Sequence, residues 1–357
     1  MNDPSTSPWT FGSLRTEHFG YVESCLQARG IQAPILLPEM IEQENRLTAL
    51  PFERWARQCI DSIKANIEHC FVSTFVPNAF AGRTPNNTYY IAFHMGVLEI
   101  GRAMAGILQN HGVRDFLNLG PYVELKKDEP NGEFSLLLGL SYQWLVYHEL
   151  GHIKNGHLHL RLGNAQAPLF EAVETMQTSD LVDRNITRHT LEMDADAFAA
   201  GEVVLPLLNA PQDMIPNCPI LQSPEHKLKA FYVAMYTMMR SFDNGTWKLA
   251  DLYRYTHPPG LIRAAGLGAW GYAFAEKITL DLPQQNWIDY SAQAAAVVEQ
   301  ALQTKGNPFI LRELAGFFPD GFAAYVKQTL ARWAKIRPEL EPHILGGGLA
   351  APQEAPA

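Results

Sequence analysis

Two histidines four residues apart are the strongest chemical signal in this sequence. His148-Glu-Leu-Gly-His152 falls within an apolar segment that predicts a helix. Residues four apart lie on one face of a helix about one turn from each other, so both imidazoles can bind one metal ion. A glutamate directly after the first histidine of HExxH is typical of zinc enzymes, where it acts as the general base. The sequence therefore predicts His148 and His152 as zinc ligands and Glu149 as the base.

The same motif has a plainer interpretation. Two partly buried histidines on an amphipathic helix produce HExxH without any metal, and a long chain can contain the pattern by chance. A catalytic zinc needs a third protein ligand and an open fourth position, so the motif gains weight only if another donor exists downstream.

A second acidic block supplies such a donor. Glu192 and Asp196 lie one turn apart in a segment that is otherwise apolar, which predicts a core helix. We expect Glu192 to be the third ligand and Asp196 to accept a hydrogen bond from the free ring N–H of a ligating histidine. Asp194 is expected to point away into solvent. The alternative is that these residues form an exposed acidic face, with no metal.

Thr256-His-Pro-Pro-Gly-Leu-Ile-Arg263 is a third candidate block. An imidazole aimed at a cleft can stabilise the oxyanion of a tetrahedral intermediate, so His257 is a candidate for catalysis. Arg263 could bring a positive charge toward the cleft or pair with a carboxylate. The alternative for His257 is a residue that only makes the loop before a helix more rigid.

The rest of the chain must position these blocks. Strands are expected at 71–76, 88–93 and 121–126, because these segments are rich in β-branched and aromatic residues. Apolar residues at intervals of three and four predict helices at 17–29, 51–69, 96–110, 134–160, 184–204, 227–242, 260–276, 291–303 and 320–335. This pattern predicts an α+β fold that is mostly helical, with a small sheet.

The residues Asn78, Ala79, Phe80 and Ala81 follow Pro77 between the first two predicted strands. A peptide substrate commonly binds a peptidase as an added strand, so an exposed edge strand would offer its backbone N–H and C=O groups. The small alanines would let a peptide approach closely. The alternative is an ordinary strand end.

Four blocks in this order resemble the gluzincin peptidases that include the CAAX prenyl protease and the bacterial heat-shock protease HtpX. The blocks are Asn78–Ala81, His148–His157, Glu192–Ala199 and Thr256–Arg263. They are similar to the family patterns NAFA, HExxH followed by Asn-Gly, ExxAD, and THPP with a later arginine. The resemblance implies a zincin domain whose edge strand lies beside the HExxH helix. It also implies one zinc ion held by His148, His152 and Glu192, with Glu149 as base and His257 at the oxyanion.

Two features depart from that family. Its members are typically integral membrane proteins, whereas no apolar segment here has the roughly 20 residues of a membrane span. Membrane-bound or prenylated substrates are therefore not expected. The family often has an arginine three residues before the glutamate ligand, and His189 stands there in this chain. A more distant comparison is with phage-exclusion peptidases of the Lit type, which also carry HExxH and would imply a narrow specificity.

The composition excludes several classes of protein. With 47% hydrophobic residues and 38 aromatic side chains (18 Phe, 13 Tyr, 7 Trp), the chain is expected to fold rather than remain disordered. A net charge of −9 makes nucleic acid an unexpected partner. The four cysteines show no CxxC spacing, and the first residues show no secretion signal. We therefore expect reduced thiols and a cytoplasmic location.

These observations predict an N-terminal arm at 1–47, a zinc metallopeptidase domain at 48–280, a helical extension at 281–345 and a low-complexity tail at 346–357. Residues 163–180 are polar and are expected to form a surface connection or lid. The expected activity is hydrolysis of a peptide or protein substrate by an endopeptidase, with the oligomeric state left open. The alternative is a zinc-binding regulatory or interaction module without turnover. An intact Glu149 argues against it, since a structural site needs no base.

Overall fold

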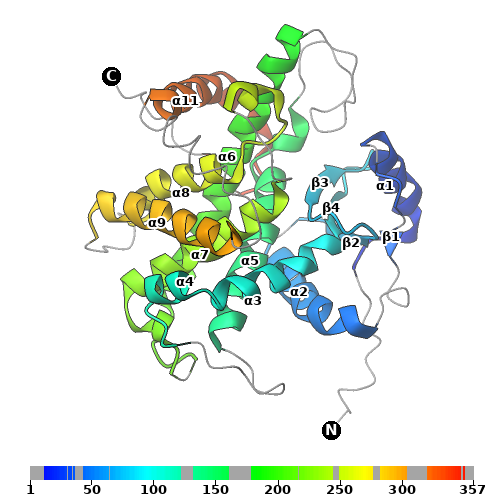
Figure 1. Cartoon of the computed structure of the whole chain (residues 1–357). Coiled ribbons are helices and arrows are strands. Elements are labelled where there is room, and N and C mark those ends of the chain that lie inside the picture. Colours follow the sequence, from blue (N-terminus) through cyan, green and yellow to red (C-terminus); the bar gives the residue numbers. More distant parts are fainter. Residues whose placement is uncertain are drawn as a thin grey trace.

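The structure is a computed structural model that describes residues 12–29, 31–33, 35–36, 43–63, 65–121, 132–160, 178–215, 217–243, 249–275, 282–303, 320–346 and 349. It is mostly helical and contains one four-stranded sheet (Figure 1). The predicted class, α+β with a small sheet, is confirmed at this level. Most of the expected strand at 121–126, most of the segment 163–180, part of the N-terminal arm and most of the C-terminal tail lie outside the described residues.

The sheet has the strand order β1-β2-β4-β3. Its members are β1 (Ile35–Leu36), β2 (Ile67–Val72), β3 (Ala79–Arg83) and β4 (Tyr89–His94). β2 and β4 run parallel, whereas the β1–β2 and β3–β4 pairs are antiparallel. β3 is therefore an edge strand, joined to β4 by a turn in which the N–H of Thr84 donates to the carbonyl of Thr88.

The two faces of the sheet are covered by different helices, because successive side chains of a strand point to opposite faces. On one face, Val22 and Leu26 of α1 (Thr16–Ala28) pack with Phe80 and Tyr90. On the other face, Phe52 of α2 (Gln43–Asp61) meets the rings of β2, β4 and α5. Figure 1 shows the sheet lying between α1 and the helical body.

The predicted helix at 51–69 is wrong at its C-terminal end. α2 ends at Asp61, and residues 67–72 form β2, which replaces the strand expected at 71–76. All six side chains of β2 are buried, as in a strand covered on both faces. A short buried strand that contains polar residues such as Glu68 and His69 shows no clear period of two, so its pattern does not distinguish it from the end of a helix.

The central helix of the body is α5 (Gly132–Lys154), which packs against α2, α6, α7 and β3. The other helices are α3 (Ile100–Leu108), α4 (His111–Phe116), α6 (Thr178–Asn209), α7 (Pro224–Phe242), α8 (Gly260–Ala275), α9 (Gln284–Gln303) and α11 (Asp320–Leu340), with short 3-10 turns that include η4 (His157–His159). The helices expected at 227–242 and 260–276 are confirmed, and those at 184–204, 291–303 and 320–335 are longer than expected.

The helix predicted at 134–160 ends early, at Lys154. Asn155 and Gly156 form a turn, and Gly156 has a φ of 77°, the left-handed conformation that glycine adopts without steric cost. A Cβ at Gly156 would also approach within 2.9 Å of the side chain of His343. The chain therefore reverses just after the HExxH motif, and His157 lies in η4 rather than on the helix.

The C-terminal helices pack on this body. Trp287 and Val298 of α9 belong to the main hydrophobic core, and Trp333 of α11 packs with Leu191 of α6. All four cysteines are free thiols. Within the described ranges, none of the helices combines the length and the apolar content that crossing a bilayer requires.

Candidate metal centre

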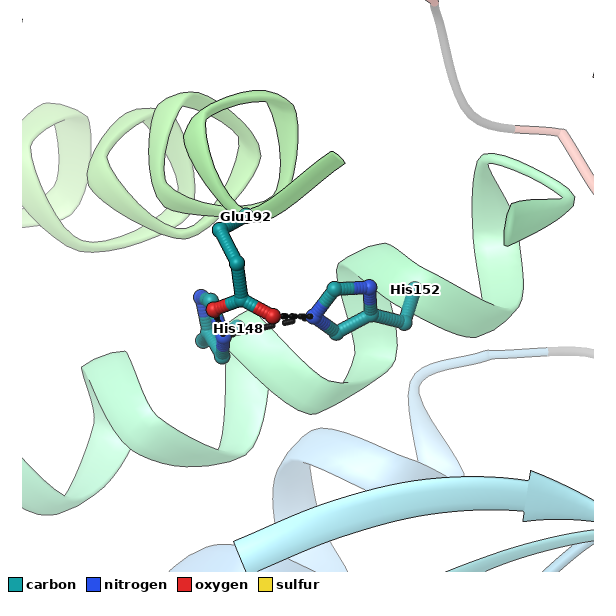
Figure 2. A group of neighbouring side chains, drawn as sticks. All are labelled: His148, His152 and Glu192. Atoms are coloured by element: carbon teal, nitrogen blue, oxygen red, sulfur yellow. Dashed lines mark hydrogen bonds and ion pairs between the residues drawn. The ribbon is translucent and has the colours of Figure 1, made fainter. Parts of the chain in front are cut away.

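Three side chains from α5 and α6 converge on one point (Figure 2). Nε2 of His148 lies 3.3 Å from Oε2 of Glu192, and Nε2 of His152 lies 3.4 Å from Oε1 of the same carboxylate. The two Nε2 atoms are 3.3 Å apart. A tetrahedral ion with bonds of about 2.0–2.1 Å holds its ligand atoms about 3.3–3.4 Å apart. The two nitrogens are therefore separated as they would be on a single tetrahedral metal ion, and each lies at a similar distance from a different oxygen of Glu192.

The composition of the group agrees with its spacing. Two imidazoles and one carboxylate form a donor set that suits zinc, and such ligands also bind other divalent transition metals. Among the described residues, the group has three members, all of them buried. Three protein ligands leave one position for water or substrate, as in catalytic rather than closed structural sites.

The motif's glycine explains how the two helices come close enough. A Cβ on Gly151 would lie 3.1 Å from Cα of Ala195 and 3.2 Å from the ring of Phe198. A larger residue at position 151 would therefore push α6 away from α5. The small pair Gly151 and Ala195 lets the helices approach beside the metal group.

The outer nitrogen of His148 is held by a buried ion pair. Nδ1 of His148 lies 2.9 Å from Oδ1 of Asp196, as expected for a carboxylate that orients a ligating histidine. Arg263 donates to both oxygens of Asp196, at 2.8 and 2.6 Å. The ring of Trp144 stacks on His148 with centroids 5.2 Å apart. Arg263 thus pairs with a carboxylate, which was one of its two expected roles, and it supports His148 from behind.

The outer nitrogen of His152 is held by residues that the sequence analysis did not assign to the site. Nδ1 of His152 lies 2.9 Å from Nδ1 of His157, whose Nε2 lies 3.0 Å from Oδ2 of Asp194. Asn155 also donates to that oxygen, at 2.6 Å. The expectation that Asp194 is solvated is wrong, because its exposed fraction is 7%. The early end of α5 brings η4 against α6, and the Asn-Gly pair after HExxH is the sequence signal for that turn.

Glu149 is buried beside the three ligands, with an exposed fraction of 4%. Burial raises the pKa of its carboxyl group, while the charges of His148 and His152 oppose the rise and that of Glu192 adds to it. Glu149 directly follows His148 in α5 and is not itself a member of the group. A carboxylate with a raised pKa is a better proton acceptor.

His257 lies on the open side of the group. Its Nε2 is 3.5 Å from Oε1 of Glu192, and its side chain is 58% exposed. The backbone before it is fixed by α6, because Nε2 of His189 donates to the carbonyl of Tyr255 at 2.8 Å. Burial lowers the pKa of His189 to about 4, so this imidazole is neutral. His189, which departs from the family pattern, therefore supports the loop of His257.

The edge strand β3 contacts α5, the helix that carries His148 and His152. The Thr84–Thr88 hydrogen bond, together with the pairing of Ala81 opposite Ile91, fixes which backbone groups face β4. In an antiparallel pair the hydrogen-bonded positions alternate, so Phe80 and Gly82 bond to β4. The backbone groups of Ala79 and Ala81 point away from β4, toward the outer edge of the sheet, where Ala81 is 5% exposed. There the N–H of Ala79 is bonded by the side chain of Asn78, at 2.9 Å.

The charges of the group are balanced before any metal binds. Burial alone would raise the pKa of Glu192, but the charge of His257 and hydrogen bonds from His148 and His152 hold it well below its usual value. Burial opposes protonation of His148, yet Asp196 and Glu192 raise its pKa to about 9. Burial lowers the pKa of His152. In the metal-free protein at pH 7, His148 is therefore protonated and His152 is neutral.

Comparison with known proteins does not assign the chain to a family. No family model matches the chain, and neither the curated proteins nor the solved structures contain a significant match. The geometry of the metal group and the four short sequence blocks are therefore the observations that bear on function.

Proposed function

We propose that this protein is a zinc-dependent endopeptidase. The observation that carries the proposal is the buried group of His148, His152 and Glu192, whose two imidazole nitrogens have the separation of ligands on one tetrahedral ion and whose three members would leave one position open. The buried carboxylate of Glu149 beside this group supports the assignment, since a purely structural metal site has no use for a nearby base.

Each residue of the site has its own role in the proposed hydrolysis of a peptide bond. A bound zinc ion supplies Lewis acidity, which polarises the scissile carbonyl and makes the attacking water more acidic. Glu149 accepts the proton of that water and then donates it to the leaving amine. His257, on the open side of Glu192, donates a hydrogen bond to the oxyanion that develops on the carbonyl oxygen. Asp196 and Arg263 hold the ring of His148 in its ligating orientation.

The edge strand is the proposed binding site for the substrate backbone. The outward-facing N–H and C=O of Ala81 would pair with an extended peptide that lies alongside α5. Because the backbone of the substrate supplies these hydrogen bonds, selectivity for particular side chains should be modest. A folded substrate would need an exposed loop or terminus.

The alternative, a zinc-binding module without turnover, makes a different prediction about Glu149. The test is to incubate the zinc-loaded protein and its Glu149→Gln variant with a proteome-derived peptide library and to identify new N-termini by mass spectrometry. The amide cannot accept the proton of the water, so cleavage should occur only with the unmodified protein while both bind zinc equally. Equal cleavage by both proteins would reject Glu149 as the base. No cleavage by the zinc-loaded protein would reject the peptidase.

A further inference from the structure

The two ligating histidines have different outer partners. Nδ1 of His148 meets the carboxylate of Asp196 directly. Nδ1 of His152 meets another imidazole, that of His157, and the carboxylate of Asp194 lies one step further away. Outer partners of this kind fix the tautomer and the orientation of a ligating ring. We infer that His157 is a positioning residue of the metal centre, which keeps Nε2 of His152 unprotonated and directed at the metal; this inference rests on the proposed metal centre.

With both imidazoles neutral, the hydrogen atoms of this chain of residues have one consistent arrangement. A neutral imidazole carries one proton, and Asp194 as a carboxylate can only accept. His157 must therefore donate from Nε2 to Asp194, which leaves its Nδ1 with a lone pair. That lone pair can only accept from His152, so the proton of His152 is on Nδ1. Nε2 of His152, which faces Glu192 and the metal position, is then the free ligand atom.

The reverse arrangement brings two acceptors together. If His157 donated from Nδ1 to His152, its Nε2 would have no proton and would face Asp194 lone pair to lone pair at 3.0 Å. His152 would then carry its proton on Nε2, where the metal must bind. Asp194 thus determines the tautomer of a ligand that it does not touch.

Burial protects this arrangement from competition by water. His157 has an exposed fraction of 0%, and His152 of 4%. Asn155, itself buried, donates to Asp194 and holds its carboxylate in place. In a water-excluded site an unpaired polar group is costly, so the alternative tautomers are disfavoured more strongly than they would be at the surface.

The chain offers a matched control in the same turn. His159 lies two residues after His157 in η4, and it contacts Arg83 and Tyr89 and stacks on His343. His157→Phe removes both hydrogen bonds of the relay, whereas His159→Phe disturbs the same turn without touching it. A glutamine at position 157 carries a carbonyl that can accept from His152 and an amide that can donate to Asp194.

The experiment measures zinc and cobalt dissociation constants by competition with a chromophoric chelator, together with the visible absorption spectrum of the Co²⁺ form. His157→Phe should weaken binding by about 10- to 100-fold and change the spectrum, while His159→Phe should leave both unchanged. His157→Gln should recover most of the affinity. Equal affinities for His157→Phe and the unmodified protein, or equal losses for the two phenylalanine variants, would overturn the inference.

A second measurement needs no variant. In protein labelled with ¹⁵N-histidine, long-range ¹H–¹⁵N spectra distinguish the two neutral tautomers of each ring. His157 should carry its proton on Nε2 and zinc-bound His152 on Nδ1, and a proton on Nδ1 of His157 would overturn the inference. Neither measurement depends on peptide cleavage. A protein with this relay and with zinc but without turnover would reject the peptidase and keep the positioning role.

Discussion

Asp196 lies between His148 and Arg263. Its Oδ1 lies 2.9 Å from Nδ1 of His148, and Arg263 donates to Oδ1 at 2.6 Å and to Oδ2 at 2.8 Å. All three side chains are buried. The guanidinium compensates the charge of a carboxylate that would otherwise be costly in the protein interior. The same carboxylate orients His148 of the candidate metal group, so folding stability and the geometry of that group depend on one ion pair.

This arrangement predicts a large effect of Arg263→Met. Breaking a buried ion pair by removing one partner leaves an uncompensated charge, so the free energy of unfolding of the metal-free protein should fall by about 3–5 kcal/mol. Urea unfolding monitored by circular dichroism measures it. Arg102→Met is the control, because the Arg102 side chain is 80% exposed in its pair with Glu99 and should contribute less than about 1 kcal/mol. Similar losses for both variants would contradict the prediction.

Metal binding should release a proton. The pKa of His148 is raised to about 9 in the metal-free protein, so this ligand is protonated at pH 7.5 and must lose its proton when a metal binds. Calorimetry in buffers of different ionisation enthalpy should show release of about one proton per metal ion. The apparent dissociation constant should fall about tenfold per pH unit up to about pH 9 and level off above it.

The control for this pH dependence is Asp196→Asn. The amide removes the negative charge that raises the pKa of His148, so proton release at pH 7.5 should be smaller than in the unmodified protein. Metal binding without any proton release in the unmodified protein would show that His148 is already neutral.

His257→Phe should separate catalysis from metal binding. Loss of one hydrogen-bond donor to the oxyanion lowers kcat by about 10²- to 10³-fold in comparable sites, and the zinc content should stay unchanged. Steady-state kinetics on a cleaved peptide and metal analysis by mass spectrometry measure the two effects. Thr256→Val is the control, since it removes only the neighbour that bonds Nδ1 of His257. Loss of zinc in His257→Phe would instead identify His257 as a ligand.

The register of β3 identifies Ala81 as the residue whose substitution by proline tests substrate binding. The N–H of Ala81 points away from β4, so Ala81→Pro removes that donor and leaves the hydrogen bonds to β4 in place. The value of kcat/KM should fall by roughly 3- to 10-fold, the loss expected for one hydrogen bond, with zinc retained. Ala81→Ser keeps the donor and should retain activity. Ala79→Pro should have less effect, because Asn78 already occupies that N–H.

Local spacing was sufficient to predict which residues form the candidate metal group. His148 and His152 are one turn apart on α5, and so are Glu192 and Asp196 on α6. A side chain's direction on a helix depends only on its position along that helix, so each pair could be assigned to a common face from the sequence. The same reasoning located the helices at 227–242 and 260–276, whose apolar period is unbroken.

His157 shows what the sequence could not determine. In a continuous helix a residue five positions after His152 points about 140° away from it, so the spacing of the two residues does not predict a contact between them. The helix instead ends at Lys154, and Gly156 turns the chain back in the left-handed conformation. His157 then meets His152 and Asp194 at once.

The choice of partner for each ligand was likewise made by the tertiary structure. Asp194 and Asp196 are aspartates two residues apart on the same helix. Asp194 nevertheless faces η4, whereas Asp196 faces Arg263 of α8. Which carboxylate supports which histidine depends on how α5, α6 and α8 pack, and in particular on the close approach that Gly151 allows at Ala195. Such contacts join segments far apart in the chain, and the free energy of packing selects them.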